Sequence, residues 1–477
     1  MKVLVVQLAR LGDLLLTTPV LRALRRTHPD WDLHLLLRKS FSAGAGWVPS
    51  DIQIHSMDTP HILGPVLGEP VAWTEALDHL GSLVNQLRSQ KFDLVINLTF
   101  SAASSYLVHQ LGLAREQTRG YTRHGDGYLD IPDDPSAYFY GQVGEGTSNR
   151  LHLTQIFAEV AGVELVQNDW LPLWRGQKSN QVSVHVGASL KKKTLNPSGW
   201  AALLSDFADR TQTQIVLMGA PEEVPLGAAV ADRLPPDQVL NRVGTTRFQD
   251  LQEILCSSRF LLAADSGPMQ LASLLGVPVL CLSQGPVNPC ETGPRSVGSR
   301  ILILEDPNQI DASVLGAEVF RYFRGDRALW QAQDIEDSCG EPRFNYVPSG
   351  ERHWDLIQSI YLARRVNIDL SPKELAILGQ LDETNELCLE QIQRIRQGRE
   401  VSLSTGLLSR GEELLELVFR QCDLFQPILG WWLTEKVRIG PGTIADVAEG
   451  TLHVHLSLRN LIGNLKGVRH EEARMVR

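Results

Sequence analysis

Short apolar runs alternate with segments of helical spacing along the first part of the chain. The strand-like runs lie at residues 3–6, 33–37 and 92–98. Helical spacing follows the first run over residues 20–26 and precedes the third over residues 73–88. Alternation of this kind with short connections predicts βαβ units and a parallel sheet with helices on both faces.

The same alternation begins again after residues 170–179, which we interpret as a linker. The second set of strand-like runs lies at residues 182–186, 214–218, 260–264 and 277–282. Helical spacing occurs between them at residues 198–209, 248–257 and 269–275. The pattern therefore predicts an α/β chain with two Rossmann-like parallel-sheet lobes that face a cleft.

The pattern changes from about residue 325 onward. Helical periodicity dominates there, over residues 351–366, 371–397, 409–436 and 443–465. By contrast, residues 114–146 are rich in Gly, Asp, Tyr and Pro and have little periodicity, which predicts a long loop. We expect a first lobe over residues 1–175, a second lobe over 176–325 and a mainly helical extension over 326–477.

The composition narrows the possible partners. The chain has 477 residues, of which 43% are hydrophobic and 21% charged, and its formal net charge is −10. The negative charge argues against an extended basic surface, so we expect no nucleic-acid partner. The six cysteines form no C-x-x-C pair, which we interpret as reduced thiols in a cytoplasmic protein. Neither a signal-peptide pattern nor a run of eighteen apolar residues occurs, which leaves only peripheral contact with a membrane open.

Candidate chemistry begins at the end of the first predicted strand. The sequence Arg10-Leu11-Gly12-Asp13 stands between that strand and a predicted helix. Ligands of parallel α/β sheets lie at the carboxyl ends of the strands, which would place Asp13 at the mouth of a cleft. Position alone favours a plainer interpretation, in which Asp13 only caps the helix.

Two further segments of the second lobe could contact a nucleotide. The lysines 191–193 follow a predicted strand, where they form either a phosphate clamp or a solvated turn. Glu222 and Glu223 follow the next strand and Gly219. A carboxylate there either accepts hydrogen bonds from a ribose diol or favours a helix N-terminus.

A third segment of this lobe is Asp265-Ser266-Gly267, which ends a predicted strand and opens a helix. Such a turn presents free backbone amides to an anion, or it is a capped helix without a ligand. There is no G-x-G-x-x-G after the first strand and no Walker A motif, so dehydrogenase and P-loop functions lose their main support. Asp30-Trp31-Asp32 looks like an ordinary turn, and we expect no metal site.

Taken together, these motifs resemble those of glycosyltransferase family 9, the heptosyltransferases. The resemblance covers about residues 1–325, and the motifs occur in the family's order: Arg10-Leu11-Gly12-Asp13, Thr17-Thr18-Pro19, Lys193 before Trp200, Gly219-Ala220-Pro221-Glu222, Asp265-Ser266-Gly267-Pro268-Met269, Gly285-Pro286 and Gly293-Pro294. It implies a GT-B fold with an acceptor-binding first lobe and a donor-binding second lobe. It also implies transfer of heptose from ADP-heptose to the inner core of lipopolysaccharide, a glycolipid acceptor, with inversion and without metal or other cofactor. Peripheral contact of the protein with the cytoplasmic face of the inner membrane stays open.

The resemblance also assigns roles residue by residue. Asp13 takes the place of the family's general base, and Arg10, Gly12 and Thr17 lie on the acceptor side. The residues matched to the donor side are Ser189, Lys192, Lys193, Gly219, Glu222, Glu223, Asp265, Ser266, Gly267 and Gln270. Lys193 and the amides of Ser266 and Gly267 would stabilise the ADP leaving group in place of a metal.

Two departures from the family pattern limit this assignment. Leu195-Asn196-Pro197 stands where the family usually has Trp-Pro after the lysine, which leaves the choice among Lys191, Lys192 and Lys193 open. Gln270 stands where the family usually has His, and an amide cannot become a cation, which favours a different nucleotide-sugar donor or a protein acceptor as an alternative. The extension lies outside the resemblance and leaves a non-catalytic sugar-nucleotide-binding or scaffold protein as another. Its apolar residues 424–433 are either core between helices or a membrane- or partner-binding patch.

Overall fold

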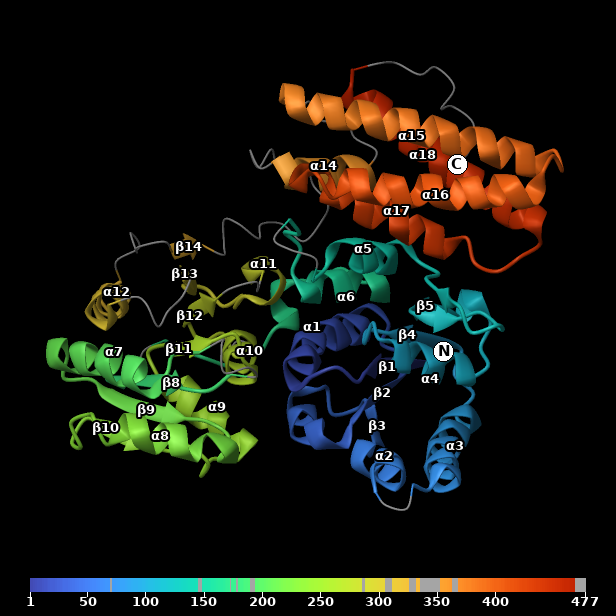
Figure 1. The fold of residues 1–477 in the computed structure, drawn as a ribbon. Helices are drawn as coiled ribbons and strands as arrows, with labels where there is room; N and C mark the ends of the chain where they lie inside the picture. Colours follow the sequence, from blue (N-terminus) through green and yellow to red (C-terminus); the bar gives the residue numbers. More distant parts are fainter. Residues whose placement is uncertain are drawn as a thin grey trace. The chain divides into compact units, whose positions relative to one another are not determined.

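The computed structural model describes residues 1–68, 71–144, 148–171, 173–176, 179–188, 194–284, 288–304, 311–325, 332–334, 352–362 and 368–467 (Figure 1). The chain divides into two compact units. The first comprises Met1–Thr99 and Arg150–Pro342, and the second comprises Phe100–Asn149 and Arg343–Arg477. Residues 100–149 thus cluster with the helical extension and not with the lobe in which we expected them. None of the described helices combines the length and the hydropathy that a membrane-spanning segment requires.

The first sheet of the first unit follows the predicted alternation. Its strands in this unit are β1 (Lys2–Gln7), β2 (Asp32–Arg38), β3 (Gln53–Met57) and β4 (Leu94–Asn97). They run parallel in the order β3-β2-β1-β4. The helices of this lobe are α1 (Leu11–Thr27), α2 (Thr59–Leu67), α3 (Trp73–Ser89) and α6 (Leu153–Ala161), with 3-10 turns at Lys39–Trp47 and Gln167–Asp169. Strand β3 was missed because its exposed and half-buried residues give no apolar run.

The second sheet confirms the second half of the pattern. Its strands are β8 (Gln181–His185), β9 (Gln214–Met218), β10 (Val239–Asn241), β11 (Leu261–Ala264), β12 (Val279–Gln284), β13 (Arg300–Leu304) and β14 (Ala332–Asp334). Their order is β10-β9-β8-β11-β12-β13-β14, and only the β13–β14 pair is antiparallel. The helices are α7 (Pro197–Arg210), α8 (Val224–Ala231), α9 (Phe248–Ser257), α10 (Gly267–Leu274), α11 (Pro289–Thr292) and α12 (Ala312–Phe323), with a 3-10 turn at Pro221–Glu223.

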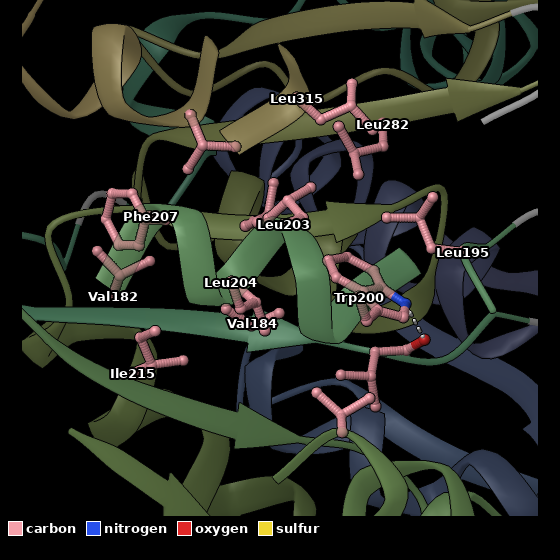
Figure 2. Close-up of a cluster of buried hydrophobic side chains, with 14 of the residues drawn as sticks. Val182, Val184, Leu195, Trp200, Leu203, Leu204, Phe207, Ile215, Leu282 and Leu315 are labelled. Atoms are coloured by element: carbon pink, nitrogen blue, oxygen red, sulfur yellow. Dashed lines mark hydrogen bonds between the residues drawn. The ribbon is translucent and has the colours of Figure 1, made fainter. Parts of the chain in front are cut away.

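Hydrophobic cores on both faces hold the second sheet in place. Helices α7, α8 and α12 supply one core, and α9 and α10 supply the other. Trp200 of α7 is fully buried in the first core (Figure 2). Its indole N–H donates to the Val186 carbonyl and to Thr194 Oγ1, each at 3.0 Å. Trp200 therefore fixes the end of β8, from which the chain enters the site described below.

The second unit combines a small β structure with the helical extension. Its elements are α4 (Ala102–Gln110), β5 (Thr118–Gly120), β6 (Thr122–Arg123), β7 (Leu129–Asp130), α5 (Asp134–Gln142), α14 (Arg352–Leu362), α15 (Pro372–Arg396), α16 (Val401–Phe419), α17 (Gln426–Arg438) and α18 (Ile444–Leu465), with 3-10 turns at Arg115–Gln117 and Asp423–Phe425. The predicted helical extension is confirmed. The helix expected over residues 409–436 is wrong, because the chain breaks between α16 and α17 at Asp423–Phe425.

Two expectations for this unit have different outcomes. The long loop over residues 114–146 is wrong, since it contains the β6–β7 hairpin and α5. These elements are too short for periodicity to appear, and α5 begins instead on a local signal, the Asp133 side chain that accepts from the Ser136 amide at 2.8 Å. For residues 424–433, the core interpretation is confirmed. The buried members of that segment are Leu424, Phe425, Ile428, Leu429 and Trp432.

Candidate functional site

A cavity of about 340 Å³ in the first unit gathers residues from distant parts of the sequence. Its lining residues are Arg10, Leu11, Gly12, Asp13, Leu16, His185, Ala188, Glu223, Asp265, Ser266, Gly267, Pro268, Gln270 and Thr292. Most of them follow the carboxyl ends of β1, β8, β9 and β11, because parallel strands direct the loops after them to one edge of each sheet. The beginnings of helices α1 and α10 both line this cavity, and the two helices are in contact.

Asp13 is the third residue of α1, whose N-cap is Arg10. Burial raises the pKa of Asp13, and the nearby Asp265 carboxylate raises it further, while the charge of Arg10 and the backbone amides of Arg10 and Asp13 lower it. Arg10, and not Asp13, is therefore the N-cap, and Asp13 lies in the first turn of the helix. Its carboxylate lines the cavity, where a ligand can reach it. A raised pKa makes the ionised form a better proton acceptor.

Glu223, and not Glu222, is the glutamate that lines the cavity. Its Oε2 accepts from the Ala220 amide at 2.7 Å and lies 3.4 Å from His185 Nε2. Burial by itself would raise the pKa of Glu223, but the hydrogen bonds and the charge of His185 outweigh burial and lower it. Glu222 is exposed and is not among the lining residues.

Two glycines make room for the Glu223 carboxylate. A Cβ atom at Gly187 would lie 1.5 Å from Glu223 Oε1, and one at Gly219 would lie 2.5 Å from Glu223 Oε2. Contacts this short do not occur between real atoms, so a side chain at either position would displace the carboxylate. The predicted Gly219 therefore shapes the site without lining the cavity.

Gln270 is only 5% exposed, and its amide is held in one orientation. Its Nε2 donates to the Thr292 carbonyl at 2.5 Å. Gln270 Oε1, Ser266 Oγ and His185 Nδ1 are buried and have no hydrogen-bond partner in the part of the chain that the structure describes. Buried polar atoms are usually paired. Three such atoms on residues of one cavity wall indicate a site for polar groups of a ligand.

The beginning of α10 has the features of an anion site. Ser266 is its N-cap but makes no side-chain capping bond, and Pro268 occupies the first turn. The first-turn amides of a helix lack partners within the helix, and the helix dipole adds partial positive charge at this end. Gly267 has no side chain to cover these amides. This turn can therefore receive a phosphate group.

The remaining predicted residues have different positions. Thr17 is fully buried, donates to the Asp13 carbonyl at 2.8 Å and accepts from Gln7 Nε2 at 3.1 Å, so it packs behind the cavity wall. Ser189, Lys192 and Lys193 lie outside the described residues. His185 was missed, although a histidine that ends an apolar strand is a signal that could have indicated it. No group of three or more potential metal ligands occurs among the described residues.

Comparison with known proteins shows which family part of this chain resembles. Residues 160–315 match the model of glycosyltransferase family 9 (heptosyltransferase). Lipopolysaccharide heptosyltransferase 3 of Escherichia coli K12 is 24% identical over 284 residues, which cover 57% of this chain and 79% of that protein.

Solved structures give the same result for the fold. The family 9 glycosyltransferase of Veillonella parvula matches with a TM-score of 0.50 and 18% identity, over 68% of this chain and 97% of that one. The E. coli heptosyltransferase WaaC with ADP matches with a TM-score of 0.51 and 18% identity, over 68% of this chain and 100% of that one. The two parallel sheets and these neighbours confirm the expected GT-B fold.

Proposed function

Because this chain carries a glycosyltransferase family 9 domain and is a glycosyltransferase, we propose that it transfers a heptose from ADP-heptose to a hydroxyl of a lipopolysaccharide inner-core-type acceptor. The transfer inverts the anomeric carbon and needs no metal. The observation that carries this proposal is the single cavity in which a carboxylate of raised pKa lies together with the amide end of a helix.

In this proposal Asp13 is the general base. The acceptor hydroxyl oxygen forms the new bond to the anomeric carbon, and its proton passes to the Asp13 carboxylate. At the same time the bond between the anomeric carbon and the β-phosphate oxygen breaks, and ADP leaves with the electron pair. A hydroxyl is a poor nucleophile, so removal of its proton during bond formation lowers the barrier.

The leaving ADP develops negative charge, which the beginning of α10 can stabilise. The Ser266 and Gly267 amides and the Ser266 hydroxyl are the candidate donors at this turn. The role of Lys193 rests on the sequence match alone. On the acceptor side we propose Arg10 and Gly12, whose positions in the cavity wall support a contact with the incoming sugar.

For the nucleoside we propose Glu223 as the ribose ligand, in preference to Glu222. A carboxylate with a lowered pKa is ionised at neutral pH and accepts two hydroxyl hydrogen bonds. This proposal is supported by the position of Glu223 in the cavity wall, where the amide of Ala220 and the ring of His185 hold its carboxylate.

A different nucleotide-sugar donor is the second candidate, because Gln270 stands where the family usually has His. With Nε2 on the Thr292 carbonyl, the atom left for a ligand is the acceptor Oε1. Because Oε1 can only accept hydrogen bonds, it selects a hydroxyl of the sugar and repels a phosphate oxygen. The donor sugar therefore contributes a hydroxyl at this position.

The experiment is a donor panel. Purified full-length protein is incubated with ADP-heptose, UDP-sugars and GDP-sugars, with and without a core acceptor and with and without EDTA, and nucleotide release is followed. We expect acceptor-dependent ADP release that survives EDTA and is lost in Asp13→Asn. Release of UDP or GDP in preference to ADP would identify the second candidate. Binding of ADP-heptose without transfer to any lipid-core acceptor would overturn the proposed reaction.

A further inference from the structure

The second unit contains its own cavity, larger than the one described above. Its volume is about 850 Å³, and it is lined by the β6–β7 hairpin and by residues of α4, α5, α16, α17 and α18. Three tyrosines of its wall are partly exposed: Tyr106 by 49%, Tyr128 by 70% and Tyr140 by 39%. We call this cavity the tyrosine pocket. Its remaining wall is largely aliphatic, with Leu408 and Leu433 among its members.

A fixed cation lies in the wall of the tyrosine pocket. The guanidinium of Arg123 stacks over the Tyr106 ring, with Cζ 4.2 Å from the ring centroid. Arg123 Nε donates to Ser105 Oγ at 2.8 Å, and Nη1 donates to the Gly127 carbonyl at 3.1 Å. Among the described residues, Arg123 Nη2 donates to none. The side chain is thus held by three contacts and keeps donors for a ligand, which lowers the entropy that binding would cost.

The two acidic side chains of the pocket wall, Glu412 and Asp126, have different contacts. Glu412 accepts from Lys436 Nζ at 2.8 Å on one oxygen and lies 3.3 Å from His455 Nε2 on the other. His455 is itself fully buried, with Nδ1 2.7 Å from Asn385 Oδ1. The other acidic side chain, Asp126, accepts from the Tyr128 amide within the hairpin turn at 3.1 Å. The free donors of the wall therefore lie chiefly on Arg123, whereas Asp126 is exposed at the hairpin turn and keeps acceptor capacity.

We propose that the tyrosine pocket binds an anionic saccharide, namely the phosphate-bearing sugar part of the acceptor. Aromatic rings pack against the apolar C–H faces of sugar rings, and three partly exposed tyrosines around one cavity supply such faces. The guanidinium of Arg123 matches the geometry of a phosphate, with which it forms paired hydrogen bonds. The identity of the ligand as acceptor rests on the proposed function, whereas the pocket and its charge do not.

The test measures binding to the full-length protein by isothermal titration calorimetry. The probe is a deacylated lipopolysaccharide core oligosaccharide that carries phosphates, and the same oligosaccharide after dephosphorylation is the paired probe. Inorganic phosphate, phosphatidylglycerol vesicles and an acidic peptide are the remaining arms. The variants are Arg123→Met, which keeps an apolar contact with Tyr106, and Tyr128→Ala at the exposed tip of the hairpin. Arg410→Met is the matched control, because Arg410 is an exposed arginine of the same unit outside the pocket.

We expect Arg123→Met to weaken binding of the phosphorylated probe by about tenfold or more, because a charge-assisted hydrogen bond is lost. Dephosphorylation should weaken binding to the parent protein similarly and change binding to Arg123→Met little. Tyr128→Ala should weaken both probes, and Arg410→Met should weaken neither. Because Tyr128 is an exposed turn residue, its variant tests the pocket even if Arg123→Met folds poorly.

Several results would overturn the inference. Equal binding of both probes would remove the role of charge, and equal binding by Arg123→Met and the parent would remove the role of this pocket. Stronger binding of vesicles or of the acidic peptide than of the oligosaccharide would identify another class of ligand. A titration with ADP-heptose separates this inference from the proposed function. If ADP-heptose is bound and transferred while the oligosaccharide is not bound in the second unit, only the inference fails. If the oligosaccharide binds and ADP-heptose does not, only the proposed function fails.

Discussion

Substitution of Gly187 by alanine should disturb the site through a single side chain. The added Cβ would lie 1.5 Å from Glu223 Oε1 and 2.0 Å from Glu223 Cδ, while nothing else is within these distances. Glu223 is a long, flexible side chain, so we expect it to move away and the backbone to remain in place. Gly187 is not among the residues of positive φ, and alanine is therefore compatible with its backbone.

The expected loss of stability follows from the contacts that the displaced Glu223 carboxylate would lose. Its carboxylate accepts from the Ala220 amide at 2.7 Å and lies 3.4 Å from His185 Nε2. Hydrogen bonds to charged groups contribute about 1.5–3 kcal/mol each, but the contact with His185 is long and the displaced carboxylate regains water. We therefore expect Gly187→Ala to lower the free energy of unfolding of the first unit by about 2 kcal/mol. Donor affinity should fall by about tenfold if Glu223 binds the ribose.

A double-mutant cycle with Glu223→Ala tests the mechanism. Unfolding in urea and binding of ADP are measured for the parent, both single variants and the double variant. Without the Glu223 carboxylate the clash is absent, so Gly187→Ala should cost less than about 0.5 kcal/mol in that background. If Gly187→Ala costs as much in the Glu223→Ala background as in the parent, the glycine is needed for another reason and the reasoning is wrong.

Three further predictions address the base, acid stability and helix packing. Asp13→Asn should lower transfer by about a hundred- to ten-thousand-fold. The substitution should also raise the melting temperature at neutral pH, because the pKa of Asp13 is raised on folding and its ionised form therefore destabilises the native state. An unchanged rate of ADP release in Asp13→Asn would contradict the role of Asp13 as base. His152 is buried with its pKa lowered well below the ordinary value, so the native state loses stability as pH falls below about 6.5, where the unfolded chain takes up the proton. His152→Gln should make urea unfolding less sensitive to pH between about 7.5 and 5.5, and an equal pH dependence in both proteins would refute this. Gly430→Ala places a Cβ 2.0 Å from the Gly141 carbonyl oxygen and should lower the free energy of unfolding by about 3 kcal/mol or more. Gly379→Ala has open space around it and should raise the free energy of unfolding by about 0.5–1 kcal/mol. Similar melting temperatures of the two variants would show that α5 and α17 can separate.

The alternation of strands and helices could be predicted from the sequence because buried parallel strands are continuous apolar runs. Strands β8 and β11 illustrate this, since their apolar residues are almost completely buried. The position of Asp13 and of the turn at Ser266 could be predicted for a related reason. Both follow the carboxyl end of a strand, and the topology of parallel sheets brings such ends to one edge.

Other features depended on contacts that no local pattern contains. Residues 100–149 contain short elements without periodicity, and their place with the helical extension follows from packing such as that of α5 against α17. The choice between Glu222 and Glu223 was decided by the space that Gly187 leaves for one carboxylate. The tyrosine pocket likewise joins Arg123 and Lys436, which lie far apart in the sequence.

The two parallel-sheet lobes, the order of the motifs and the candidate base could all be predicted from the amino-acid sequence. These features depend on burial period and on local helix signals, which are written within a few neighbouring residues. The glutamate that lines the cavity, the orientation of Gln270 and the separate cavity of the second unit became visible only in the folded chain. Those features arise where side chains that are distant in the sequence meet. Their geometry is set by close packing, which a single added Cβ atom can disturb.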